Sequence, residues 1–164
     1  MFKLECQCYN REILQHLINE MMTKYFAYGS NMNFGQMIAR CPGAVLTGQA
    51  SLRGWSYFIN GNGYAGIERS NDQIVHGCLW NLKKYHWIAL DRYESVESGY
   101  YSRKKMEVEI NPTQPKEVVW IYLSNDLTYG RPTLPYQTLV VQGARENSLP
   151  TQYIENLESW LHFE

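Results

Sequence analysis

A β-hairpin is indicated by residues 55–67, whose sequence is WSYFINGNGYAGI. Two apolar runs flank the turn residues Asn60 to Gly63, and an Asn-Gly turn between such runs strongly favours a hairpin. The same glycines match the letters of the dinucleotide-binding motif G-x-G-x-x-G. That motif requires a helix after the glycines, whereas Ile67 and the following residues keep strand character. The match is therefore accidental, and Gly63 and Gly66 instead predict close approach of a ligand or another backbone.

Short strands and a few helices are expected on both sides of this hairpin. Apolar, β-branched and aromatic runs predict strands, whereas apolar residues at helical spacing predict helices. The expected strands are 25–28, 44–50, 55–59, 64–67, 74–82, 100–110 and 118–123, and the expected helices are 33–40, 84–93, 135–144 and 148–162. Hairpin-linked strands with few helices indicate an α+β domain around an antiparallel or mixed, barrel-like sheet.

Length and composition fit a protein with one packed core. The chain has 164 residues, 45% of them hydrophobic and 19% charged, which excludes a disordered chain. Its net charge of −1 argues against a nucleic-acid binder. We therefore interpret the basic clusters 83–87 and 103–105 as a solvated helix face and a strand edge rather than as a single-strand binding groove. No apolar run reaches the roughly 18–20 residues of a membrane helix, and no signal-peptide pattern is present, so we expect a soluble, cytoplasmic protein.

The first 22 residues differ from the rest of the chain. Apolar residues at positions 13, 14, 17, 18 and 21 share one face at helical spacing, and Asn10 could cap the start of that helix. The segment is either a docking helix or sequence upstream of the true start. We therefore divide the chain into an N-terminal appendage, residues 1–22, and a domain, residues 23–164.

The cysteines and histidines do not form a recognisable metal or nucleophile motif. Cys6 and Cys8 with the distant His16 do not supply the spaced ligand pairs of a tetrahedral zinc site. In a chain of this length without a secretion signal, cysteines are expected to be reduced thiols rather than a disulfide framework. We expect no metal and no other cofactor.

Two segments combine the residue types of a functional site. The first, residues 26–32 (FAYGSNM), leads from a strand through a turn into a helix, so consecutive backbone N–H groups can face an anion or a developing oxyanion. An ordinary strand-to-helix turn explains the same residues equally well. The second, residues 90–101 (LDRYESVESGYY), places acids beside tyrosines. A carboxylate in an aromatic pocket can have a raised pKa and act as a general base, but an exposed acidic loop is the commoner arrangement.

Taken together, these segments resemble the γ-glutamylcyclotransferase family, which includes plant avirulence-induced and butirosin-biosynthesis relatives. The resemblance rests on three blocks in a fixed order: YGSN at 28–31, LDRYESV at 90–96 followed by GYY at 99–101, and GARENSLP at 143–150 followed by Tyr153. It covers the chain from about Lys24 to Leu157. It implies a small mixed or antiparallel β-barrel flanked by helices, with a polar cavity at one end.

The resemblance also implies roles for seven residues. The acid/base of the family matches Glu94. The substrate-binding residues of the family match Tyr28, Gly29, Ser30, Asn31, Tyr101 and Tyr136. The chain departs from the family at Ser95, where many members have glycine, so the backbone and the pocket shape are expected to differ there.

The activity implied by the resemblance is cyclisation of a γ-glutamyl amide to 5-oxoproline with release of an amine or amino acid. One carboxylate can take the proton of the substrate's α-amino group and give it to the leaving amine, so this metal-independent transferase or lyase reaction needs no cofactor. A γ-glutamyl amino acid, a γ-glutamyl amine and a larger γ-glutamyl-protected intermediate share the reacting head group and all remain open. Glutathione is less expected, because glutathione-specific relatives have Leu where Asn31 stands.

The alternative is a non-catalytic module on the same barrel that binds a small ligand or a partner. Such a module should have lost Glu94, which this chain keeps. In either case we expect a small-molecule ligand, no nucleic-acid or membrane partner, and a monomer or homodimer.

Overall fold

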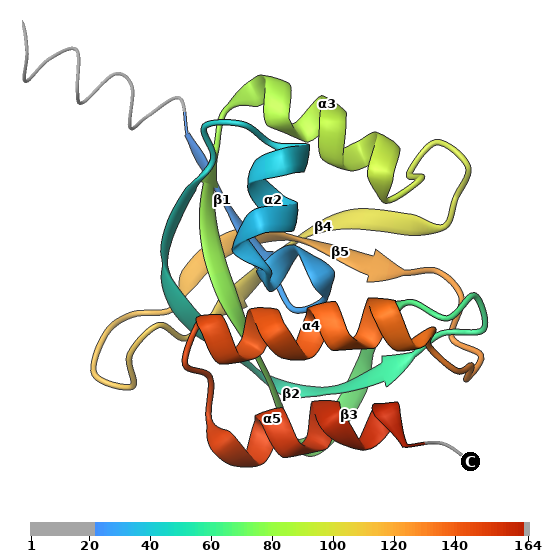
Figure 1. Cartoon of the computed structure of the whole chain (residues 1–164). Coiled ribbons are helices and arrows are strands. Elements are labelled where there is room, and N and C mark those ends of the chain that lie inside the picture. The colour runs from blue at the N-terminus through green and yellow to red at the C-terminus, as the bar shows by residue number, and fades with distance from the viewer. Residues whose placement is uncertain (1–21, 163–164) are drawn as a thin grey trace, which may run out of the picture.

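The computed structural model describes residues 22–162, and one mixed sheet of five strands forms its centre (Figure 1). The strands are β1 (Thr23–Ala27), β2 (Val45–Ile59), β3 (Ala65–Leu82), β4 (Tyr101–Val108) and β5 (Glu117–Ser124). Their order across the sheet is β2-β3-β1-β5-β4. The central strand β1 is antiparallel to β3 and parallel to β5, whereas β2–β3 and β4–β5 are antiparallel pairs. The predicted α+β class and the mixed sheet are confirmed.

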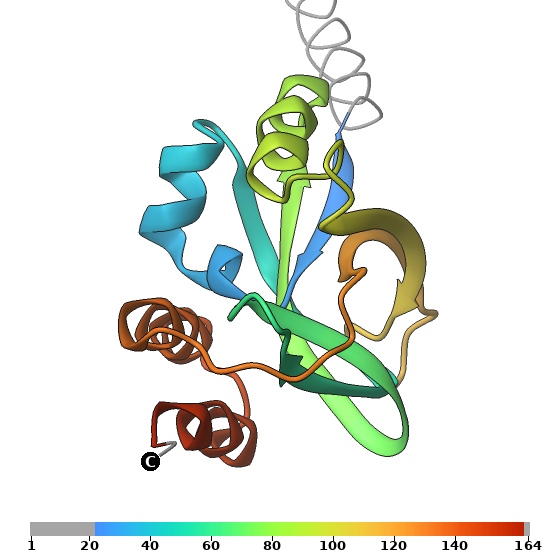
Figure 2. The ribbon, with the colours of Figure 1, turned by 90° about the vertical axis from the view of Figure 1, so that its right-hand side faces the viewer.

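The helices form two groups around this sheet. They are α2 (Phe34–Arg40), α3 (Lys84–Tyr93), α4 (Leu134–Glu146) and α5 (Thr151–Glu158), with short 3₁₀ turns η1 (Ser30–Met32) and η2 (Ser159–Leu161). α4 and α5 lie side by side against one side of the β2–β3 hairpin, and Figure 2 shows them nearly end-on there. α2 and α3 lie near the other end of the sheet. This arrangement leaves the end of β1, which leads into η1, between the two groups of helices.

The sheet is not closed into a barrel, so the prediction of a barrel is wrong. A barrel requires a continuous ladder between its first and last strands. Here the edge strand β2 meets the end of the β4 segment at one bridge, where the N–H groups of Ser51 and Glu109 donate to each other's carbonyl oxygens at 2.8 and 2.9 Å. Glu109 follows β4 directly, and the chain then turns at residues 111–114. Within residues 22–162 this isolated bridge is the one pairing between the two edges, so no continuous ladder closes the sheet.

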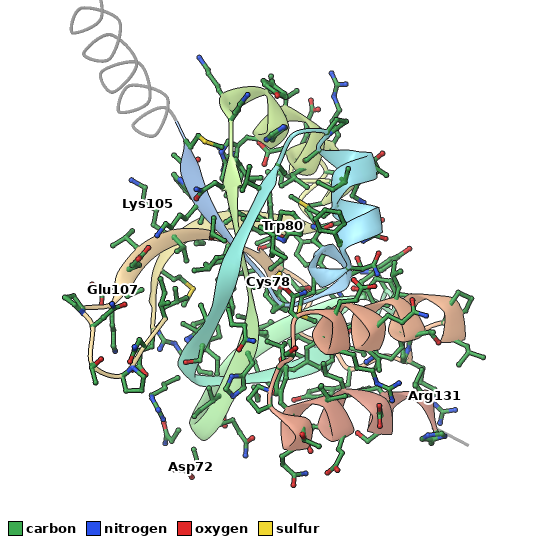
Figure 3. All side chains as sticks on the ribbon, turned by 60° about the vertical axis from the view of Figure 1, so that its left-hand side comes forward. Asp72, Cys78, Trp80, Lys105, Glu107 and Arg131 are labelled. Atoms are coloured by element: carbon green, nitrogen blue, oxygen red, sulfur yellow. The ribbon has the colours of Figure 1, made fainter. Side chains whose placement is uncertain are left out.

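Four predicted strands are in fact two long ones. The predicted strands 44–50 and 55–59 belong to β2, and 64–67 and 74–82 belong to β3. The β2–β3 register shifts near Gly48 and again near Gly54, and Gly54 has a φ of 80°, which glycine adopts readily. The bulges and the polar residues near Asp72 break the apolar alternation, although the ladder continues. Figure 3 shows Asp72 of β3 at the outer edge of the molecule, where the strand bends, whereas Trp80 of the same strand lies in the middle of the molecule.

The core joins all of these elements. Phe26, Trp80, Leu90, Ile121 and Val140 come from β1, β3, α3, β5 and α4 and are fully buried. None of the helices within residues 22–162 is long and apolar enough to cross a membrane. The predicted N-terminal helix lies outside the described residues, as do the cysteines at 6 and 8 and the histidine at 16.

Candidate active site

A cavity of about 470 Å³ opens where η1, the end of α3, the β2–β3 turn and the start of α4 meet. All seven residues singled out from the sequence line it. They are Tyr28, Gly29, Ser30, Asn31, Glu94, Tyr101 and Tyr136. The structure thus brings together residues that are up to 108 positions apart in the chain, and their individual roles remain proposals.

The turn at 28–31 forms because β1 runs directly into a short 3₁₀ helix. The backbone N–H of Met32 donates to the Gly29 carbonyl at 3.0 Å, and that of Asn33 donates to the Ser30 carbonyl at 3.1 Å. The first N–H groups of a helix have no acceptor within the helix. At Gly29 a Cβ atom would lie 3.1 Å from the Ala65 Cβ, so the backbone of this turn runs close to β3 and to the cavity.

Asn31 connects the turn to the predicted acid/base. Its side-chain amide Nδ2 donates to Glu94 Oε1 at 3.0 Å and to the Tyr25 hydroxyl at 3.0 Å. Its Oδ1 accepts a hydrogen bond from Arg40 Nη1 at 2.8 Å. Because the guanidinium can only donate, the Arg40 contact fixes the amide with its Nδ2 toward Glu94. Asn31 is only 3% exposed, so this orientation is held by its surroundings.

Glu94 has the electrostatics of a group that exchanges protons near neutral pH. Burial raises the pKa of its carboxyl from an ordinary value of 4.5 to about 7. The charge of Arg40 and the hydrogen bond from Asn31 act in the opposite direction and limit this rise in pKa. The carboxyl is positioned by the helix before it, because the Glu94 N–H donates to the Leu90 carbonyl at 2.8 Å and ends α3.

Tyrosines form a neutral wall around this carboxyl. The Tyr28 hydroxyl donates to the Tyr122 carbonyl at 2.7 Å, and the Tyr101 hydroxyl donates to the Ala65 carbonyl at 2.7 Å. The Tyr136 hydroxyl accepts from the Ala65 N–H at 3.0 Å. Burial raises the pKa of each of these phenols, that of Tyr136 to about 12. They therefore stay protonated at neutral pH, whereas the pKa of the Glu94 carboxyl, at about 7, lies close to it.

Comparison with known proteins identifies the family of this chain. Residues 74–157 match the model of the AIG2-like family. The mouse protein named gamma-glutamylcyclotransferase is 30% identical over 146 residues, which cover 82% of this chain and 77% of that protein. The chain belongs to this γ-glutamylcyclotransferase, AIG2-like family. The human protein of the same name matches with the same identity and coverage. A solved structure named gamma-glutamyl cyclotransferase has a TM-score of 0.78 at 28% identity, covering 84% of this chain and 87% of that one.

Residues of the third sequence block that resembles the family contact the end of η1 and Asn33, directly after the turn at 28–31. A Cβ at Gly143 of α4 would lie 2.5 Å from the Asn33 backbone nitrogen, so only glycine permits this approach. The Asn147 amide donates to the Met32 carbonyl at 2.9 Å, and the Asn33 amide donates to Glu146 at 3.0 Å. These residues hold η1 in place and do not line the cavity.

The backbone conformation at Ser95 is one that suits the glycine of many family members. Ser95 has a φ of 50°, in the left-handed region that glycine adopts most easily. The chain therefore keeps at this position the conformation that glycine favours, with a serine in place of the glycine of many family members. Ser95 also lines the cavity, so its side chain adds a hydroxymethyl group to the wall beside Glu94.

Sequence reasoning missed Arg40, which is the cationic side chain of the cavity. It ends α2, and in the sequence it resembles any basic residue of a last helical turn. Its guanidinium also lies 4.5 Å above the Tyr93 ring centroid. Further lining residues that the sequence did not single out are Tyr25, Asn62, Tyr64, Ala65, Tyr93, Tyr100 and Tyr122.

Proposed function

We propose that this chain is a γ-glutamyl cyclotransferase, which converts a γ-glutamyl amide to 5-oxoproline and releases an amine or amino acid. One observation carries this proposal: Glu94, with a pKa of about 7, lies in the cavity beside the turn that contains Ser30 and Asn31. The names of the curated relatives support it. The roles predicted from the sequence for the seven site residues are part of this proposal.

In the first step Glu94 acts as a base. The α-ammonium group of the substrate gives a proton to the Glu94 carboxylate, and the freed nitrogen attacks the γ-carbonyl carbon. A new C–N bond closes a five-membered ring, and the carbonyl oxygen becomes an oxyanion. A base with a pKa near the working pH is effective in both directions of proton transfer, and the pKa of Glu94 meets this condition.

In the second step Glu94 acts as an acid. The oxyanion collapses, the bond from carbon to the leaving nitrogen breaks, and Glu94 returns its proton to that nitrogen. The ring nitrogen, which carries two protons after its attack, gives one of them to the Glu94 carboxylate, and this proton then passes to the released amine, so Glu94 is again a carboxylate. The products are 5-oxoproline and a free amine, and no water is consumed. We assign the stabilisation of the oxyanion to backbone N–H groups of the 29–31 turn, because fixed donors cost no reorganisation during the reaction.

The tyrosine wall favours the folded conformer of the substrate. Ring closure requires the α-amino nitrogen to approach the γ-carbonyl, and holding reacting groups together lowers the barrier substantially. Tyr28, Tyr101 and Tyr136 have hydroxyls anchored by hydrogen bonds to backbone groups. Their rings therefore present a fixed surface to the head group.

A panel of γ-glutamyl amino acids and γ-glutamyl amines tests the proposal. We expect 5-oxoproline and free amine in equal amounts, with no heavy oxygen in the 5-oxoproline when the reaction is run in oxygen-18 water. Glutamate as the product would indicate hydrolysis, and binding without any product would indicate a non-catalytic module. The cytoplasmic location and the monomeric or homodimeric state remain expectations.

A further inference from the structure

The mouth of the cavity carries three tyrosines that the chemistry proposed above does not use. Tyr64 is 51% exposed, Tyr93 is 57% exposed and Tyr100 is 50% exposed, yet all three line the cavity. They come from three places: Tyr64 directly precedes β3, Tyr93 ends α3, and Tyr100 directly precedes β4. We call these three residues the tyrosine collar. Exposed aromatic surface that is continuous with a cavity marks a place where a ligand binds.

The residues at the inner end of the cavity are buried, whereas those of the collar are exposed. The turn residues Ser30 and Asn31 are 8% and 3% exposed, so the head group that they would bind lies at the inner end. The collar is adjacent to Glu94: Tyr93 precedes it in the chain, and the Tyr100 N–H donates to the Ser95 carbonyl at 3.2 Å. Because Glu94 would protonate the leaving nitrogen, the leaving group extends from Glu94 toward the collar.

Backbone hydrogen bonds anchor two of the collar residues, and two of the collar rings have side-chain neighbours. The Tyr100 carbonyl accepts from the Asn125 N–H at 3.0 Å, and the Tyr64 carbonyl accepts from the Asn60 N–H at 2.8 Å. Within residues 22–162, none of the three collar hydroxyls makes a side-chain hydrogen bond. Arg40 covers one face of Tyr93, and Tyr64 meets the Tyr136 ring edge-on at 5.1 Å. These contacts restrict the Tyr93 and Tyr64 rings before a ligand binds, and a restricted ring loses less conformational entropy when it contacts a ligand.

We propose that the tyrosine collar selects γ-glutamyl compounds whose leaving group carries an aromatic ring. The selection rests on the cyclotransferase function proposed above and names its preferred substrate class. Aromatic rings attract one another in offset or edge-to-face arrangements, and the collar offers three rings from three segments of the chain. A small leaving group such as alanine has no ring to pack against this surface. The ring can belong to an aromatic amino acid or to an aromatic amine, since both place it beyond the leaving nitrogen.

Three substrates with one head group separate these possibilities. γ-Glutamyl-phenylalanine, γ-glutamyl-phenethylamine and γ-glutamyl-alanine share the same scissile amide, and 5-oxoproline release reports all three reactions. We expect kcat/KM to be about 10- to 100-fold higher for the phenylalanine compound than for the alanine compound. The difference should lie mainly in KM, because the ring makes the same contacts before and during ring closure. The phenethylamine compound shows whether the preference extends to amines.

Matched variants connect the preference to the collar. Tyr93→Ala and Tyr100→Ala should each lower the phenylalanine-to-alanine ratio of kcat/KM by about 3- to 10-fold, whereas Tyr100→Phe, which keeps the ring, should preserve it. Tyr85→Ala is the control: Tyr85 is 54% exposed on α3 but does not line the cavity, so the ratio should stay at its original value.

Each outcome decides between the two proposals. A ratio that favours phenylalanine and falls in the collar alanine variants alone supports the collar. If both compounds yield 5-oxoproline but the ratio is near one, or if no collar variant changes it, the collar proposal is overturned and the cyclotransferase function stands. If none of the three compounds yields 5-oxoproline, the proposed function fails and the collar proposal falls with it.

Discussion

The raised pKa of Glu94 predicts that this residue destabilises the fold at neutral and alkaline pH. Between pH 4.5 and about 7 the folded chain holds the proton on Glu94, whereas the unfolded chain has released it. The folded state therefore binds more protons in this window, and the free energy of unfolding falls as the pH rises through it. Above about pH 7 both states are ionised, and the loss of stability is complete.

The substitution Glu94→Gln removes this pH dependence. Glutamine keeps a side-chain oxygen for the Asn31 amide, which lies 3.0 Å from Glu94 Oε1, but it never ionises. The interval from 4.5 to about 7, at about 1.4 kcal/mol for each pKa unit, gives an upper limit of about 3 kcal/mol. Solvent at the cavity mouth screens the charge and reduces this value. From pH 4.5 to pH 8 the free energy of unfolding of Glu94→Gln should rise relative to wild type by up to that amount.

Urea denaturation at pH 4.5, 6 and 8 measures this difference. Glu97→Gln is the matched control, because Glu97 lies in the same loop and is exposed, so its difference from wild type should not change with pH. A difference between wild type and Glu94→Gln that stays constant over this range would refute the raised pKa. A wild type that gains stability relative to the variant as the pH rises would refute it more strongly.

Three further predictions concern the surroundings of Glu94. Ser30→Ala should lower kcat/KM less than Gly29→Val, because a side chain at Gly29 would crowd β3 and the cavity; a loss in Ser30→Ala as deep as in Glu94→Gln would indicate a role for the hydroxyl. Arg40→Met removes a charge that lowers the pKa of Glu94. The acid limb of the pH profile of kcat/KM reports ionisation of the base, so this limb should move to higher pH in the variant. An unmoved limb would exclude an effect of Arg40 on the pKa of Glu94. Deleting residues 1–21 should leave 5-oxoproline formation nearly unchanged, and lost turnover in a folded, monodisperse protein would place that segment in the site.

Local patterns in the sequence located the hairpin and the two site segments. The Asn-Gly turn and the flanking apolar runs are local features, and the structure has the β2–β3 turn there. The extent of β2 and β3 could not be predicted, because the ladder continues through bulges that interrupt the alternation. Closure of a sheet depends on how its two edges meet in space, and a single bridge at Ser51 and Glu109 has no counterpart in local sequence.

The electrostatics of the site depend on contacts that only the fold creates. The sequence indicated that a carboxylate among tyrosines can have a raised pKa, but an exposed acidic loop was the more common explanation for such a segment. Burial of Glu94 decides between them, and it arises from packing of the α3 end against η1 and β1. Arg40 reaches Asn31 because α2 turns back over η1, and no residue pattern marks that contact. The left-handed backbone at Ser95 is likewise visible only in the structure.

The most direct test of the account is the rate of 5-oxoproline formation by Glu94→Gln, measured beside wild type and Glu97→Gln on the best substrate of the panel. The account predicts that Glu94→Gln lowers kcat by roughly 100-fold or more, because it removes the proton transfer, whereas Glu97→Gln retains wild-type turnover. Circular dichroism should show the same fold for all three proteins. Near-wild-type turnover by a folded Glu94→Gln protein would contradict the central role of this carboxylate.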